Sequence, residues 1–167
     1  MKNRNYKTII LLFLSLATLS FTACNETDDT TQWQKENQEA YDAIKANPEW
    51  TLLATNDGPD GVYYRDLTEP GTETGSEYPL QTASVTINYT GKYYTGQAFD
   101  SGKQSTFPVN GVVRGFGAAL QKMRTGQKWE VCIPYYLGYG TISTTSMQAY
   151  TTLFFEIELL KINQYPK

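Results

Sequence analysis

The chain of 167 residues contains no histidine and only two cysteines. Without histidine, Ser-His and Cys-His nucleophilic catalysis is excluded, and so are most zinc sites. Cys132 lies in an apolar strand pattern, where we expect a small core residue rather than a nucleophile. We therefore expect no metal and no cofactor, and a function that needs none of these groups.

The chain also lacks an apolar run long enough to cross a bilayer as a helix, which takes about 20 residues. Residues 1–23 begin with basic side chains, continue through a shorter apolar run and end in small residues, which is typical of a secretory signal peptide. The sequence FTAC ends at Cys24 and resembles a bacterial lipobox, in which the cysteine carries acyl chains. We therefore predict a lipid anchor at Cys24 on a bacterial membrane, expected to be the outer membrane, at its periplasmic or its cell-surface face. The alternative is a soluble secreted protein.

Basic residues are in the minority. Removal of residues 1–23 takes away Lys2, Arg4 and Lys7 but no acid, which leaves 11 basic residues against 17 acidic ones, a net charge of −6. Such a balance disfavours binding to a polyanion. We therefore predict no nucleic-acid partner.

The stretch after the predicted anchor is polar and acidic. Residues 24–31 have nothing to bury, so we expect a flexible tether. Thr31 fits the start of a capping box, and apolar residues at helical spacing predict a helix over residues 32–46 that Pro48 ends. This helical extension, residues 32–49, either packs on the following domain or pairs with another copy. We expect it to pack on the domain, and the oligomeric state is left open.

From residue 50 to residue 167 the pattern changes to short strands separated by turns. Residues 84–94, 128–134 and 152–162 alternate apolar and polar side chains, the period of half-buried antiparallel strands. The segment GFGAALQKM is the only other plausible helix, about two turns long. One short helix among antiparallel strands predicts an α+β domain whose sheet wraps that helix.

Three segments then carry a family resemblance. The segments VTINYTGKYYTGQAFDS, TFPVNGVVRGFGAALQKMRTGQKWEVCIPYYLGYG and TLFFEIELL follow one another at the right separations. Together they resemble the FKBP family of peptidyl-prolyl cis-trans isomerases over roughly residues 62–162. The resemblance implies a five-stranded antiparallel sheet curled around a short helix, with a shallow apolar pocket. It implies catalysis of rotation about X-Pro bonds, with proline-containing segments of exported proteins as partners.

The resemblance also assigns residues to the pocket. Tyr89, Phe99, Asp100 and Tyr139 match positions expected to act in catalysis. The expected substrate-binding residues are Phe107, Val112, Val113, Phe116, Met147 and Phe155. We expect Asp100 at a corner made by the next two residues, where it accepts a hydrogen bond from Tyr89, and we expect Tyr139 to donate to a substrate carbonyl.

Two positions depart from the family pattern. Phe116 stands where most members have Trp, and residues 147–149, Met-Gln-Ala, replace an Ile-Pro-Pro. Both changes predict a wider pocket with a more mobile rim. They leave open an alternative, a membrane-anchored peptide-binding or chaperone module of low or no activity. A third hypothesis is a structural surface lipoprotein that assembles through the helix at residues 32–46.

Overall fold

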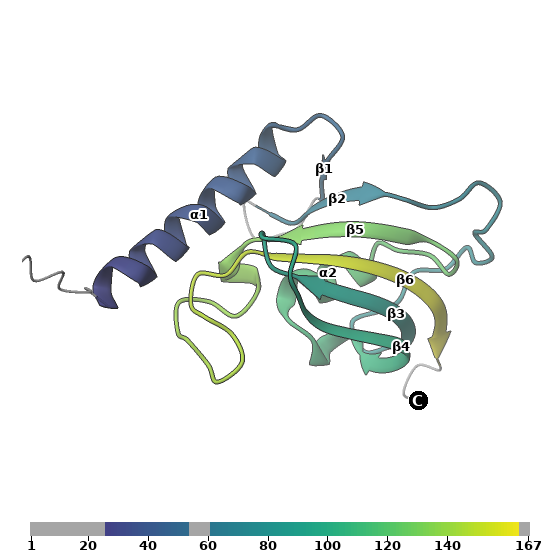
Figure 1. The fold of residues 1–167 in the computed structure, drawn as a ribbon. Coiled ribbons are helices and arrows are strands. Elements are labelled where there is room, and N and C mark those ends of the chain that lie inside the picture. The colour runs from purple at the N-terminus through teal and green to yellow at the C-terminus, as the bar shows by residue number, and fades with distance from the viewer. Residues whose placement is uncertain (1–25, 54–60, 164–167) are drawn as a thin grey trace, which may run out of the picture.

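The computed structural model describes residues 26–53 and 61–163, which form a curved antiparallel sheet with one helix on each face (Figure 1). The helices are α1 (Glu26–Ala46) and α2 (Arg114–Leu120), with single turns of 3-10 helix, η1 (Val109–Gly111) and η2 (Tyr135–Leu137). The strands are β1 (Thr51–Leu52), β2 (Tyr63–Asp66), β3 (Ser84–Lys92), β4 (Ala98–Pro108), β5 (Lys128–Ile133) and β6 (Leu153–Asn163). Their order across the sheet is β1-β2-β5-β6-β3-β4, and every neighbouring pair is antiparallel.

The alternation of side chains along the strands places two separate cores on the two faces of the sheet. On β5, Val131 and Ile133 belong to the main core around α2, whereas Cys132 between them belongs to a smaller cluster with Tyr41 of α1. Cys132 is fully buried, and burial raises the pKa of its thiol well above the usual range. The prediction of a small core cysteine is confirmed.

The prediction of five strands is wrong, because the sheet has six. The sixth is β1, an edge strand of two residues that pairs with β2. The Leu53 amide extends this pairing by donating to the Val62 carbonyl oxygen at 2.7 Å. The strands predicted over 84–94, 128–134 and 152–162 are confirmed as β3, β5 and β6, and the helix in GFGAALQKM as α2.

Helix α1 ends before Asn47, as predicted, but begins at Glu26 rather than near residue 32. The predicted tether is therefore helical over residues 26–31, and Thr31 lies inside the helix instead of capping it. Acidic residues are favourable near the positive end of a helix, so the composition that indicated a tether also suits a first helical turn.

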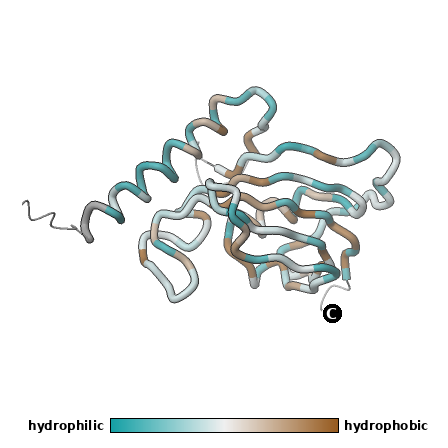
Figure 2. The backbone as a smooth tube through the Cα atoms, viewed as in Figure 1, coloured by the Kyte–Doolittle hydropathy of each residue, from teal (hydrophilic) through white to brown (hydrophobic). Residues whose placement is uncertain are grey.

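Figure 2 shows α1 as largely hydrophilic, whereas apolar positions recur along the strands. No helix in the described ranges combines the length and the apolar character that crossing a bilayer requires. The predicted signal peptide and Cys24 lie outside the described residues.

Candidate active site

A cavity of about 310 Å³ lies beside the N-terminal end of α2. The residues that enclose it come from β3, β4, η1, α2, the loop after η2 and β6. The residues that line it are Tyr89, Asp100, Phe107, Gly111, Val112, Val113, Phe116, Tyr139 and Phe155. Eight of these were predicted from the sequence. We call this cavity the aromatic pocket.

The walls of the aromatic pocket are aromatic rings that pack edge to face. Phe116 and Phe155 are 4% and 6% exposed, and their ring centroids lie 4.8 Å apart at an angle of 83°. Tyr89 lies 5.6 Å from Phe107 and 6.3 Å from Phe116, again edge to face. Such contacts are favourable for the ring quadrupoles and leave an apolar surface toward the cavity.

Asp100 is the one charged residue among those that line this pocket. Its Oδ2 accepts a hydrogen bond of 2.9 Å from the Tyr89 hydroxyl, as predicted, and its Oδ1 accepts one of 2.8 Å from the Ser101 amide. Burial, and secondarily the bond to Asp100 and its charge, raise the pKa of Tyr89 to about 12. Tyr89 therefore keeps its proton at neutral pH and holds the carboxylate in a fixed orientation.

The predicted corner at Ser101 and Gly102 is wrong, because both residues lie within β4. Gly102 pairs with Tyr89, and a Cβ atom at residue 102 would lie 2.6 Å from the Tyr89 ring. The irregularity comes two residues later, where Gln104 has φ +50° and its amide donates to Asn88 Oδ1 at 2.9 Å. The glycine of FDSG thus makes room for an aromatic ring rather than for a turn.

Tyr139 follows η2 and is 43% exposed at the mouth of the pocket. Burial of its ring, and then the negative charge of Asp100, raise its pKa, so the hydroxyl stays protonated. Within the described ranges no group forms a hydrogen bond with this hydroxyl. It is therefore free to donate to a bound molecule.

Two predicted residues do not line the pocket. Phe99 is an extra residue of β4 at a register shift, and its ring lies behind the wall, 5.6 Å from Phe155. Met147 is 4% exposed in the main core, and its amide and carbonyl both bond to Thr144. The segment predicted as a mobile rim is therefore held in a hydrogen-bonded turn.

Two glycines of the site were not predicted from the sequence. Gly111 lines the pocket, and Gly91 lies under its wall, where a Cβ atom would be 2.6 Å from the Phe99 ring and 2.7 Å from the Phe155 ring.

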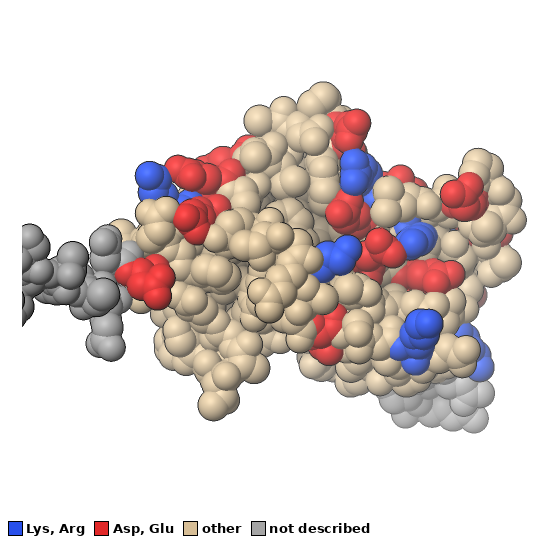
Figure 3. Space-filling model, in the orientation of Figure 1, with Lys and Arg blue, Asp and Glu red and all other residues tan. Residues whose placement is uncertain are grey.

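Residues 131–155 contain no Asp, Glu, Lys or Arg. Figure 3 accordingly shows an uncharged surface over the loop between η2 and β6. This charge-free run is visible in the sequence and marks the rim of the pocket.

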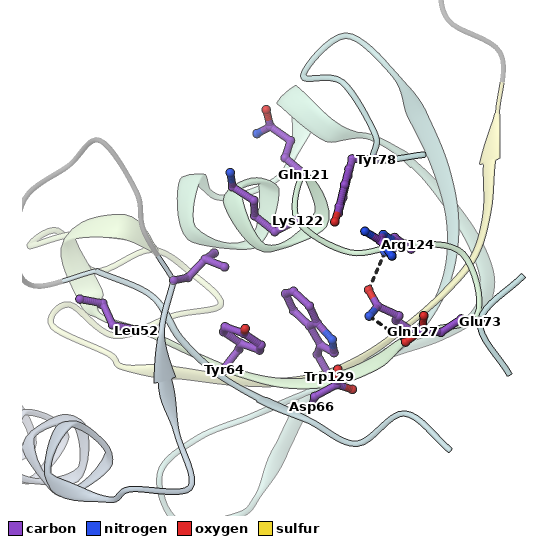
Figure 4. Close-up of a pocket in the computed structure, with 11 residues that line it drawn as sticks. Leu52, Tyr64, Asp66, Glu73, Tyr78, Gln121, Lys122, Arg124, Gln127 and Trp129 are labelled. Atoms are coloured by element: carbon purple, nitrogen blue, oxygen red, sulfur yellow. Dashed lines mark hydrogen bonds between the residues drawn. The ribbon is translucent and has the colours of Figure 1, made fainter. Parts of the chain in front are cut away.

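A second hollow, of about 660 Å³, lies beyond the C-terminal end of α2 (Figure 4). Its described lining residues are Leu52, Leu53, Tyr64, Asp66, Glu73, Tyr78, Gln121, Lys122, Arg124, Gln127 and Trp129. We call it the charged groove, since four of these residues are ionic. Tyr64 stacks on Trp129 at 4.2 Å, and Gln127 accepts from the Arg124 amide and donates to Glu73. Among the described residues, no group of three His, Cys, Asp or Glu side chains is placed to hold a metal ion.

The sheet that wraps a short helix and the aromatic pocket beside that helix define a class of protein, and comparisons with known proteins give the same class. A family model described as FKBP-type peptidyl-prolyl cis-trans isomerase matches residues 75–160. The chain therefore belongs to this family.

Three relatives illustrate the similarity. The FKBP-type 22 kDa peptidyl-prolyl cis-trans isomerase of Escherichia coli (strain K12) is 45% identical over 89 residues, which cover 50% of this chain and 43% of that protein. The outer membrane protein MIP of Legionella longbeachae is 37% identical over 139 residues, covering 78% of this chain and 56% of that protein. The crystal structure of a peptidyl-prolyl cis-trans isomerase from Pseudomonas syringae pv. tomato str. DC3000 has a TM-score of 0.69 at 32% identity, covering 81% of this chain and 96% of that one. The chain spans about half the length of the curated relatives that it matches first.

Proposed function

We propose that this chain catalyses cis–trans isomerisation of X-Pro bonds in polypeptides. The observation that carries the proposal is the aromatic pocket, which combines apolar walls with one oriented carboxylate and one free hydroxyl. Family membership supports the same activity. The relatives named as peptidyl-prolyl isomerases support it as well.

The chemistry suits such a pocket because it needs no nucleophile. Rotation about an amide has a barrier of about 18–20 kcal/mol, since resonance holds the planar form and places charge on its oxygen and nitrogen. The twisted amide is less charge-separated than the planar one. Apolar walls that exclude water therefore disfavour the planar ground state relative to the twisted state, and the barrier falls.

Each part of the pocket has a role in this proposal. The rings of Phe116, Phe155 and Tyr89 grip the proline ring, and Phe107, Val112 and Val113 extend the apolar surface. The Tyr139 hydroxyl donates to a carbonyl oxygen of the substrate. Asp100 orients the substrate and, through its bond to Tyr89, fixes the shape of the pocket; it transfers no proton. Phe99 supports the wall from behind.

The test is exchange NMR on an Ala-Phe-Pro peptide with the full chain held in detergent micelles. We expect the exchange between cis and trans peaks to accelerate at substoichiometric protein, and Tyr139→Phe to slow it by about three- to tenfold, the value of one hydrogen bond. Saturable binding of the peptide without any acceleration, even at stoichiometric protein, would show a binding module instead of an isomerase.

We further propose that residues 1–23 are a signal peptide, that Cys24 is lipidated, and that residues 50–167 form the isomerase domain, linked to the anchor by the helical extension. The FTAC sequence supports the anchor. The name of the Legionella longbeachae relative, an outer membrane protein, supports export to that membrane. The clients in this proposal are proline-containing segments of exported proteins.

The two cysteines provide a matched test of the anchor. Expressed in a Gram-negative host, the chain should sediment with membranes, and Cys24→Ser should move it to the soluble fraction. Cys132→Ser is the control, because Cys132 is buried in the domain. Equal sedimentation of the wild type and Cys24→Ser would contradict the lipid anchor.

A further inference from the structure

Helix α1 is fixed to the domain by polar groups that are inaccessible to water. Among the described residues, the buried polar side chains are Asn37, Thr151 and Thr152, and all three lie where α1 meets the segment before β6. The Thr152 amide donates to Asn37 Oδ1 at 2.8 Å, and the Thr152 hydroxyl donates to the Asn37 carbonyl oxygen at 3.0 Å. Asn37 Nδ2 donates to the Trp33 carbonyl oxygen at 2.8 Å, so both polar atoms of this side chain are hydrogen-bonded. Buried polar networks of this kind specify one arrangement, since any shift leaves groups unpaired.

A chain of hydrogen bonds leads from α1 into the loop that carries Tyr139. Trp33 Nε1 donates to the Thr151 hydroxyl at 3.1 Å, and that hydroxyl donates to the Gln148 carbonyl oxygen at 2.7 Å. The Tyr150 amide then closes the loop by donating to the Gly140 carbonyl oxygen at 2.9 Å. Gly140 directly follows Tyr139, so the position of the Tyr139 hydroxyl depends on this closure.

A second path consists of aromatic rings. The Trp33 ring contacts Tyr93 at 5.8 Å between centroids, and Tyr93 contacts Phe99 at 5.1 Å. Phe99 contacts Phe155 at 5.6 Å, and Phe155 forms the pocket wall with Phe116 at 4.8 Å. The ring of Phe99, which does not line the pocket, thus joins α1 to the wall that does. A displacement of one ring in this packed row shifts the neighbouring rings, because protein interiors have few voids that could absorb it.

We propose that Trp33 and Asn37 are positioning residues of the proline pocket, and that α1 must be docked for the pocket to reach full activity. This inference rests on the proposed isomerase function. Trp33 belongs to both paths, since its indole N–H begins the hydrogen-bonded chain and its ring begins the aromatic one. The Tyr94 hydroxyl, which donates to the Glu36 carboxylate, holds the next turn of the same helix face. A purely stabilising helix has no need to contact both the loop of Tyr139 and the ring behind Phe155.

Three variants of the full chain in detergent micelles separate the two paths. Trp33→Phe removes the bond to Thr151 but keeps a ring against Tyr93, Trp33→Ala removes both, and Gln38→Ala is the control on the exposed side of α1. Peptide exchange is measured at a temperature where circular dichroism shows every variant fully folded. We expect kcat to fall by about threefold in Trp33→Phe and by about tenfold in Trp33→Ala, with KM little changed, and no change in Gln38→Ala.

A second readout does not depend on activity. We expect the ring resonances of Phe155 and Tyr139 to shift in the NMR spectrum of Trp33→Ala and to stay in place in Gln38→Ala, although neither ring is among the aromatic neighbours of Trp33. Unchanged kcat per folded molecule in Trp33→Ala, or unmoved ring resonances, would overturn the inference. If the wild type itself fails to accelerate exchange, the proposed function fails, and the ring resonances alone decide whether α1 positions the pocket.

Discussion

The two hollows at the opposite ends of α2 differ in the charge of the residues that line them as well as in size. The charged groove is about twice as large, yet Asp66, Glu73, Lys122 and Arg124 line it, and charged groups of both signs keep a surface hydrated. The aromatic pocket has one carboxylate, and both oxygens of that carboxylate accept hydrogen bonds. Because a twisted amide is favoured where water is excluded, the smaller hollow is the better place for prolyl isomerisation.

Truncation of one aromatic ring in each hollow should give the largest contrast. Phe155→Ala removes a wall of the aromatic pocket, and we expect kcat/KM to fall by about 100-fold, which is about 2.7 kcal/mol and within the value of burying one aromatic side chain. The free energy of unfolding should fall by about 3–5 kcal/mol. Tyr64→Ala is the matched change in the groove and should lower stability but not the activity of the folded molecules. Peptide exchange measures kcat/KM, and urea unfolding measures the free energy of unfolding. Equal losses of activity in the two variants would mean that the aromatic pocket is no more important for catalysis than the groove.

The two hollows also offer a matched pair of carboxylates. Asp100→Val removes the acceptor of the Tyr89 bond, and we expect kcat/KM to fall by about tenfold with the fold intact, because the substrate loses its orienting group. Asp66→Val removes a carboxylate that accepts from the Thr68 amide at the edge of the groove, and should leave kcat/KM unchanged. Unchanged kinetics in Asp100→Val would mean that Asp100 has only a structural role in β4.

Much of this site is predictable from the sequence, and what is not predictable has identifiable causes. The alternation in β3, β5 and β6 indicates which side chains face α2, and the family resemblance places Tyr89, Asp100 and Tyr139 together. The sequence does not reveal the register shift that turns Phe99 behind the wall, since one extra residue in a strand leaves the composition unchanged. The same holds for Gly102, whose role depends on a ring from the neighbouring strand.

The sixth strand of the sheet and the start of α1 escape prediction for a different reason. Short strands are expected from residue 50 onward, and β1 lies there, but a strand of two residues carries too little pattern to show that it joins the sheet by pairing with β2. The early start of α1 is equally invisible, because an acidic stretch fits both a tether and a helix terminus. Tertiary contacts decide between such readings.

A larger ring at the pocket floor should have a smaller effect on activity. Phe116→Trp adds about 40 Å² of apolar surface against the bound proline, worth about 1 kcal/mol or a fivefold gain in kcat/KM. The larger ring crowds Phe155 and Tyr89, so the free energy of unfolding should fall by about 1–3 kcal/mol. Trp129→Phe makes the reverse exchange in the groove and should leave kcat/KM unchanged. A loss of activity in Phe116→Trp would mean that the substrate needs the space that the smaller Phe116 ring leaves in the pocket.

The proposed difference in water exclusion between the two hollows can be tested at Tyr89. Its pKa is about 12 in the folded chain against an ordinary value of 10.0, with burial as the largest cause and Asp100 second. Between pH 10 and 12 the unfolded chain releases this proton while the folded chain retains it, so the free energy of unfolding falls as the pH rises; below pH 10 the contribution is fully present. Guanidinium unfolding at several pH values should show this decline in the wild type, a weaker decline in Asp100→Asn, and none from this residue in Tyr89→Phe. Parallel curves for the wild type and Tyr89→Phe would mean that water reaches the Tyr89 hydroxyl. The aromatic pocket would then be as hydrated as the groove and would have no catalytic advantage over it.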